Sequence, residues 1–306
     1  MIETFQQDLP HGITLSCRAA GQLGRPVLLF LHGFPEAAFV WDELLEHYAQ
    51  PEHGGYRCVA PNLRGFERSS APTEVAAYRA KPLVQDLTAL IEVITQDSPT
   101  PGQLACLVAH DWGGALAWSV AAQFPAAMRK LAIVNAPHPA TFQRELATSP
   151  TQQASSAYMN FLARPDAPAL LAENDFARLW PFFTNMAADS GPLAWLDEAT
   201  RERYREVWRQ GLHGPCAYYA ASPLRPPTAS DAGAAAVQLP RERIMVNVPT
   251  LVVWGLGDTA LPEALLEGLD GYVPDMHIER VPGATHWIVH EQPEQLAALI
   301  GDFLKA

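Results

Sequence analysis

The sequence lacks the long apolar run that a membrane-spanning helix requires. Crossing a bilayer takes about 18–20 consecutive apolar residues, and no stretch of the 306 residues reaches that length. The start of the chain, MIETFQQDLP, also lacks the basic region followed by an apolar region that forms a secretory signal. We therefore expect a cytoplasmic protein with no membrane partner.

Clusters of positive charge are missing as well. The chain has 21 Lys and Arg against 33 Asp and Glu, which gives a formal net charge of -12. No five-residue block is rich in Lys or Arg. Since binding to nucleic acid or to an anionic membrane surface needs a basic patch, we expect neither partner.

Cysteine is scarce, and its spacing does not fit a metal site. The four cysteines form no CxxC pair and have no zinc-ligand spacing; they are Cys17, Cys58, Cys106 and Cys216. Three of them lie in apolar, strand-like runs, where cysteine behaves as a small hydrophobic side chain. We predict four reduced, structural cysteines and no metal, which fits a cytoplasmic compartment.

Short apolar runs alternate with helical patterns along much of the chain. Runs typical of strands buried on both faces occur at 27–32, 56–61, 104–110, 131–137, 250–255 and 276–282. Helical patterns lie between them and at the C-terminus, for example at 39–49, 82–97 and 113–124. This alternation predicts an α/β fold with a mostly parallel, doubly wound sheet.

The alternation stops between residues 138 and about 245. That stretch is rich in aromatic residues and Pro, and its pattern is helical. We interpret it as a helical cap inserted between two strands. The predicted organisation is a catalytic domain of residues 1–137 and 246–306 and a cap domain of residues 138–245.

The segment LVAHDWGGALAW (107–118) carries the strongest chemical signal. A buried strand ends at His110, Asp111 follows, and Gly113 and Gly114 lead into a helix. Small neighbours are needed where a strained strand-to-helix turn lifts one side chain above a sheet. The pattern predicts that Asp111 is a nucleophile; the alternative is a glycine turn with an Asp helix cap.

Two later segments can complete a catalytic triad. Asp258 lies in WGLGDTALP after a buried strand, and His286 lies in VPGATHWIVH after the last strand. The chain order Asp111, Asp258, His286 is the nucleophile–acid–base order of α/β-hydrolases. His290 is a competing base, but it lies in the helical run beyond the loop.

The loop FLHGFPE (30–36) can supply an oxyanion hole. It follows the first buried strand, so the backbone N–H of Phe34 can lie opposite Asp111. With the backbone N–H of Trp112, it would stabilise a tetrahedral oxyanion.

Together these motifs resemble the epoxide hydrolase branch of the α/β-hydrolase superfamily, which is related to haloalkane and haloacetate dehalogenases. HGFPE, HDWGG, GLGDTALP and PGATHW are similar to motifs of that branch. NLRGFERSSAP (62–72) resembles a structural loop of the branch, with Asn62 where many relatives have Asp. The resemblance covers residues 1–137 and 246–306 closely and the cap more weakly.

The resemblance also implies two cap tyrosines that hold the epoxide oxygen. YMNFLARP (158–165) points to Tyr158, and HGPCAYYAA (213–221) points to Tyr219, with Ala220 where the branch usually has Arg. The alternative is that both tyrosines are amphipathic packing residues. We further predict that four aromatic residues line the substrate pocket: Trp112, Trp180, Tyr218 and Trp287.

The implied function is hydrolysis of an epoxide, a small-molecule substrate, to a vicinal diol by a monomer or homodimer without metal or organic cofactor. Asp111 would form an alkyl ester, and His286, oriented by Asp258, would activate the water that hydrolyses it. A haloalkane or haloacetate dehalogenase with the same triad is the alternative, although Phe34 and Trp112 depart from the Asn and Arg of those families. A non-catalytic hydrolase-fold receptor is a further alternative, which an intact triad disfavours.

Overall fold

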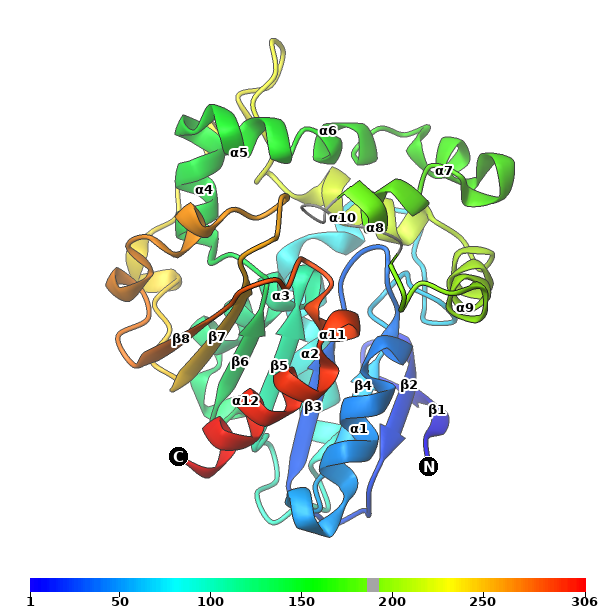
Figure 1. Ribbon diagram of the computed structural model, residues 1–306, viewed down its shortest axis with the longest axis vertical. Coiled ribbons are helices and arrows are strands. Elements are labelled where there is room, and N and C mark those ends of the chain that lie inside the picture. Colours follow the sequence, from blue (N-terminus) through cyan, green and yellow to red (C-terminus); the bar gives the residue numbers. More distant parts are fainter. Residues whose placement is uncertain (186–192) are drawn as a thin grey trace.

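The computed structural model describes residues 1–185 and 193–306 of the chain. Within these residues the centre is an eight-stranded sheet with the strand order β1-β2-β4-β3-β5-β6-β7-β8 (Figure 1). The strands are β1 (Glu3–Asp8), β2 (Thr14–Ala20), β3 (Val27–Leu31), β4 (Arg57–Pro61), β5 (Cys106–His110), β6 (Leu131–Val134), β7 (Thr250–Gly255) and β8 (Met276–Val281). Strands β3 to β8 pair in parallel, which confirms the mostly parallel sheet expected from the sequence.

The central strands coincide with the apolar runs of the sequence. Every residue of β3, β4, β5, β6 and β7 is buried. Helices cover both faces of a parallel sheet, so its strands are apolar on both sides and appear as unbroken hydrophobic runs.

Two further strands, β1 and β2, precede the strands expected from the sequence. They pair antiparallel with each other, and β2 pairs antiparallel with β4. Residues of β1 are exposed or half-buried, and those of β2 alternate between half-buried and buried. These strands form one margin of the sheet, where one side meets solvent. Polar residues on that side interrupt the apolar run from which a buried strand is predicted.

Helices flank the sheet on both faces. Helices α1 (Asp42–Ala49) and α12 (Pro293–Lys305) lie on one face, where the Tyr48 hydroxyl donates to the Ala297 carbonyl at 2.6 Å. Helices α2 (Ala80–Ile94) and α3 (Asp111–Gln123) pack together on the other face. The arrangement is the doubly wound α/β architecture expected from the alternating pattern.

A group of helices lies between β6 and β7 in the chain and above the carboxyl ends of the parallel strands (Figure 1). It consists of α4 (Pro139–Thr148), α5 (Pro150–Ser155), α6 (Tyr158–Leu162), α7 (Ala167–Phe176), α8 (Trp180–Asn185), α9 (Glu198–Trp208) and α10 (His213–Ala221). The short helix α11 (Ile288–Glu291) follows β8. The division at residues 137/138 and 245/246 into two domains stays a prediction.

The four cysteines are unpaired and buried, and burial raises the pKa of the Cys17 thiol to about 12. No helix within residues 1–185 and 193–306 is long and apolar enough to cross a membrane.

Candidate active site

Asp111 occupies the sharp turn between β5 and α3. Its φ of 48° lies in the left-handed region that L side chains rarely adopt. The helix can pass close to its surroundings only because Gly113 and Gly114 lack side chains: a β-carbon on Gly113 would lie 2.6 Å from the His32 carbonyl oxygen, and one on Gly114 would overlap the Ala136 methyl group. The turn presents the Asp111 carboxylate above the sheet, and its side chain is 16% exposed.

The loop after β3 contacts this carboxylate. The backbone N–H of Phe34 donates to Asp111 Oδ1 at 2.7 Å. Gly33 allows that approach, because a β-carbon at this position would overlap the Asp111 side chain. Trp112 lies in the first turn of α3, where backbone N–H groups have no acceptor inside the helix. The two predicted oxyanion-hole amides therefore both belong to segments that adjoin Asp111.

His286 and Asp258 approach Asp111 from the far end of the chain. His286 Nδ1 lies 2.7 Å from Asp258 Oδ2, and His286 Nε2 lies 3.8 Å from Asp111 Oδ2. Asp258 Oδ1 also accepts from the backbone N–H groups of Ala260 and Leu261, each at 2.9 Å. A carboxylate held in this way fixes the imidazole ring so that Nε2 faces Asp111.

Asn135 is a site residue to which the sequence pattern assigned no role. It follows β6, has a φ of 40°, and donates from Nδ2 to Asp258 Oδ2 at 2.8 Å. Its Oδ1 accepts from the backbone N–H of Gly255 at 3.0 Å. Asn135 thus holds both Asp258 and the end of β7. The sequence signal that could have identified it as a site residue is its position after a buried strand, which it shares with Asp111 and Asp258.

The two carboxylates control the charge of His286. Burial lowers the pKa of a histidine, but the charge of Asp258, its hydrogen bond and the charge of Asp111 outweigh burial and raise the pKa of His286 to about 9. The imidazolium is therefore the resting form at neutral pH while Asp111 is ionised.

Tyr158 and Tyr219 lie together near Asp111. Burial, followed by the charge of Asp111, raises the pKa of Tyr158, and a hydrogen bond with Tyr219 opposes this rise. Burial also raises the pKa of Tyr219, which accepts a hydrogen bond from Trp112. The Tyr219 ring packs edge-on against Phe34, with the centroids 5.2 Å apart. Both phenols therefore stay protonated and can act as hydrogen-bond donors.

These side chains adjoin a mostly apolar cavity of about 290 Å³. Asp111, Trp112, Tyr158, Tyr218 and Tyr219 are among the described residues that line it. The volume is close to the lower end of the range of about 300–1,000 Å³ that is usual for ligand pockets. The described residues contain no cluster of three or more His, Cys, Asp or Glu side chains suited to holding a metal.

Trp180 and Trp287 are both predicted to contact substrate. Neither is among the described residues that line this cavity. Trp180 packs against Trp208 at 4.7 Å and lies under the guanidinium of Arg201 at 4.8 Å. Trp287 is buried, and its ring centroid lies 4.6 Å from that of Phe183. Their indoles contribute to the packing of the inserted helices.

A buried carboxylate, Glu36, lies behind the nucleophile. Its Oε2 lies 3.0 Å from His110 Nδ1, and its Oε1 lies 2.9 Å from His290 Nε2 and 3.2 Å from the Tyr204 hydroxyl, which donates to it. Burial alone would raise the pKa of Glu36, but hydrogen bonds from the two histidines hold it below its usual range. His110 Nε2 in turn lies 2.9 Å from the His286 carbonyl oxygen. Glu36 ends the HGFPE motif, but the motif alone did not assign it a role.

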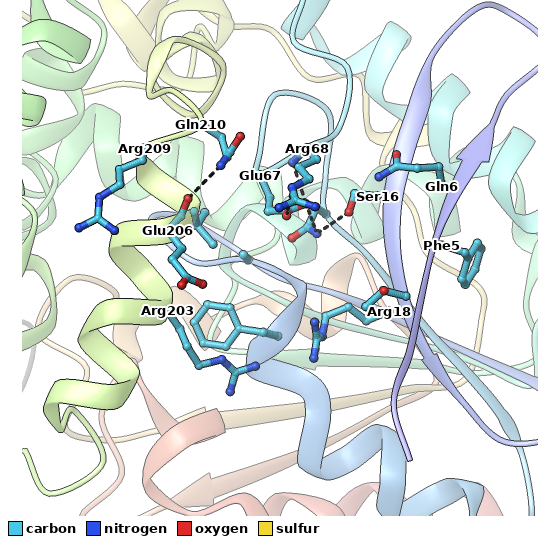
Figure 2. Close-up of a pocket in the computed structure, with 15 residues that line it drawn as sticks. Phe5, Gln6, Ser16, Arg18, Glu67, Arg68, Arg203, Glu206, Arg209 and Gln210 are labelled. Carbon is cyan, nitrogen blue, oxygen red and sulfur yellow. Dashed lines mark hydrogen bonds and ion pairs between the residues drawn. The ribbon is translucent and has the colours of Figure 1, made fainter.

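A larger groove of about 660 Å³ lies elsewhere, between α9 and the β1–β2 margin of the sheet, and Figure 2 shows its lining. None of the three predicted triad residues lines it. Its arginines face carboxylates: Arg18 and Arg203 both bind Asp42, Arg68 lies beside Glu67, and Arg209 binds Glu202. Because each of its four arginines is paired with a carboxylate and none of the predicted triad residues lines it, we take the cavity at Asp111 as the candidate active site.

The chain matches one family model and is similar to relatives from different organisms. The family model described as alpha/beta hydrolase fold matches residues 26–293. The AB hydrolase superfamily protein YfhM of Bacillus subtilis is 33% identical over 298 residues, which cover 96% of each chain. Epoxide hydrolase 3 of Xenopus tropicalis is 33% identical over 303 residues, which cover 96% of this chain and 75% of the relative.

The fold is also similar to that of solved structures. A chain described as one of the "Novel epoxide hydrolases belonging to the alpha/beta hydrolases superfamily in metagenomes from hot environments" superposes with a TM-score of 0.85. It is 34% identical, and the superposition covers 99% of both chains.

Proposed function

Because the chain belongs to the alpha/beta hydrolase fold family and is similar over nearly its whole length to epoxide hydrolases, we propose that it hydrolyses epoxides to vicinal diols. Asp111 is the nucleophile, His286 the base, and Asp258 the carboxylate that orients the base. Tyr158 and Tyr219 are the acids that bind the epoxide oxygen. The helices of residues 138–245 act as a cap that supplies these acids.

In the first step a carboxylate oxygen of Asp111 attacks an epoxide carbon. The carbon–oxygen bond of the ring breaks, and the departing oxygen takes a proton from Tyr158 or Tyr219. A carboxylate suits this displacement at a saturated carbon, whereas its attack on an acyl group would give an anhydride. The product of the step is an alkyl ester on Asp111.

In the second step water hydrolyses that ester. Esterification removes the negative charge of Asp111, one of the charges that raise the pKa of His286. The imidazolium then gives up its proton more easily, to the tyrosinate left by the first step, and the neutral imidazole takes a proton from water, whose oxygen attacks the ester carbonyl. The N–H groups of Phe34 and Trp112 stabilise the oxyanion, and collapse of the tetrahedral intermediate releases the diol and restores Asp111.

The observation that carries the proposal is the shared cavity wall of Asp111, Tyr158 and Tyr219. An alkoxide is strongly basic and needs a proton donor when it leaves, whereas a halide ion needs only hydrogen bonds. Two protonated phenols beside a carboxylate nucleophile therefore favour epoxide opening over dehalogenation.

The test is a panel of terminal epoxides, haloalkanes and haloacetates, with release of diol and halide measured in parallel. We expect diol formation, and expect Tyr158→Phe and Tyr219→Phe each to slow alkylation of Asp111 by about 10²–10³, the usual cost of removing one donor at a reacting oxygen. Asp111→Ala, checked for folding by thermal melting, should form no diol. Halide release without diol formation, or normal epoxide opening by the double Tyr→Phe variant, would overturn the proposal.

A further inference from the structure

Helix α9, one of the helices between β6 and β7, contacts the loop that carries the Phe34 amide. Trp208, the last residue of α9, donates from its indole Nε1 to the carbonyl oxygen of Pro35 at 2.7 Å. Pro35 follows Phe34 directly, and both Pro35 and Trp208 are buried. Within residues 1–185 and 193–306 no other donor binds this carbonyl. The position of the loop therefore depends on a side chain 173 positions away.

A second contact joins the same helix to the next residue of the loop. Tyr204 donates from its hydroxyl to Glu36 Oε1 at 3.2 Å. Tyr204 and Trp208 are four positions apart on α9 and so lie on one face of the helix. A loop that is held at two consecutive residues can neither slide nor rotate freely against that face.

Aromatic packing fixes the Trp208 indole itself. Trp180 and Phe183 of α8 lie against it, with ring centroids 4.7 Å and 6.2 Å away. Phe176 of α7 lies at 5.5 Å, and the Tyr204 ring stacks on the indole at 5.5 Å with an interplanar angle of 24°. Because closely packed side chains have little freedom to move, the helices between β6 and β7 determine where the indole N–H points.

The position of the Phe34 amide matters most in the second chemical step. In the resting protein the amide donates to the Asp111 carboxylate at 2.7 Å. During ester hydrolysis the same N–H faces an oxyanion, and a preorganised donor at that point accelerates the reaction. We propose that Trp208 is a positioning residue, which acts through the Pro35 carbonyl to aim the Phe34 amide at the oxyanion of ester hydrolysis. The inference rests on the proposed function.

Trp208→Phe tests this role, because it keeps an aromatic ring in the cluster but removes the donor to Pro35. We expect hydrolysis of the alkyl ester to slow by about threefold to tenfold, the rate equivalent of one hydrogen bond. Alkylation should keep its rate, since a weaker hydrogen bond to the Asp111 carboxylate does not make it a poorer nucleophile. Rapid-quench mass spectrometry of the peptide that contains Asp111 measures how fast the adduct forms and how fast it decays. In the steady state, esterified protein should accumulate while kcat/KM stays unchanged.

Trp195→Phe is the matched control. The Trp195 indole Nε1 is buried and has no hydrogen-bond partner within residues 1–185 and 193–306, and its ring lies 5.6 Å from Phe183 in the same cluster. Its removal breaks no hydrogen bond, so both rates should keep their wild-type values. Thermal melting of both variants shows whether they are folded. Tyr204→Phe, which removes the donor to Glu36, should also slow hydrolysis more than alkylation and gives the test if Trp208→Phe does not fold.

The inference is overturned if ester hydrolysis slows no more than alkylation in folded Trp208→Phe, or in Tyr204→Phe where the first variant is unfolded. An equal loss of ester hydrolysis in Trp195→Phe would overturn it as well. In each of these cases diol still forms, and the proposed function stands. If the wild-type protein forms neither the adduct nor the diol, the proposed function fails and the inference fails with it.

Discussion

At the scale of single residues, the site is governed by the charge that surrounds His286. Asp258 binds Nδ1 at 2.7 Å, and Asp111 lies 3.8 Å from Nε2. Both carboxylates favour the imidazolium, although burial opposes it. The same ring can act as a base only after one of these charges is lost, and alkylation of Asp111 removes that charge at the step where a base is needed.

We therefore predict that Asp111→Asn lowers the pKa of His286 below its value of about 9. The amide has the shape of the carboxylate but no charge to stabilise the imidazolium. Titration of the imidazole by NMR would measure the change. His138 is an internal control, since burial holds its pKa at about 4 and its partner is the Ile244 carbonyl. An unchanged His286 pKa would show that Asp111 does not control the base.

A second prediction separates the two chemical steps. His286→Gln should leave Asp111 able to attack an epoxide but unable to complete turnover, because no base activates water. Mass spectrometry should then find the substrate adduct on the peptide that contains Asp111. His290→Gln is the comparison, since His290 binds Glu36 and Tyr204 instead of Asp111. Normal turnover by His286→Gln together with an adduct in His290→Gln would reverse the assignment of the base.

At the scale of elements, helix α10 is held close to the loop after β4. Gly214 and Gly65 pack against each other so closely that a β-carbon on Gly65 would lie 2.7 Å from Gly214 Cα. The Tyr218 hydroxyl donates to the Arg64 carbonyl at 3.0 Å, and Asp86 binds the Arg64 guanidinium through both carboxylate oxygens. This contact determines where α10 places Tyr219, the residue after Tyr218.

Gly214→Ala tests that contact. The added methyl group would overlap Gly65, and overpacking of this kind typically costs about 1–3 kcal/mol. We expect a lower melting temperature and a slower alkylation step, because Tyr219 moves with α10. Hydrolysis of an ester already formed should change less. Gly271→Ala is the control, since a methyl group added there would meet no atom within 4 Å beyond its chain neighbours; an alkylation rate equally slow in both variants would contradict the argument.

At the scale of the whole molecule, buried histidines couple stability to pH. Burial lowers the pKa of both His32 and His138 to about 4, so both are neutral in the folded protein. The unfolded chain binds protons at its ordinary histidine pKa of about 6.5. The stability contributed by a depressed pKa is complete above that value and is lost as pH falls towards the folded pKa.

We predict that the free energy of unfolding falls as pH decreases from about 6.5 to about 4, with each histidine contributing about 3 kcal/mol. His286, whose pKa is raised, does not oppose this fall, since it is protonated in both states below about pH 6.5 and its contribution is lost only as pH rises through about 9. Urea unfolding at a series of pH values measures the slope. His138→Gln should make the slope shallower; an unaltered slope would rule out the buried neutral histidine as its cause.

The sequence by itself determined the parallel strands and the chain order of Asp111, Asp258 and His286. Both signals are local. A strand covered on both faces must be an unbroken apolar run, and a turn that lifts Asp111 above the sheet must have small residues beside it. Strands β1 and β2 escaped prediction because residues at a half-exposed margin have no such constraint.

Only the tertiary structure decided which distant groups meet. Glu36 and His290 are 254 positions apart, yet their side chains bind at 2.9 Å, and Asn135 binds Asp258 across 123 positions. The direction of each aromatic side chain depends in the same way on how the helices between β6 and β7 pack. An aromatic ring loses its contact with water equally well inside a helical layer or on a cavity wall. Composition and spacing therefore could not tell that Trp112 and Tyr218 line the cavity whereas Trp180 and Trp287 do not.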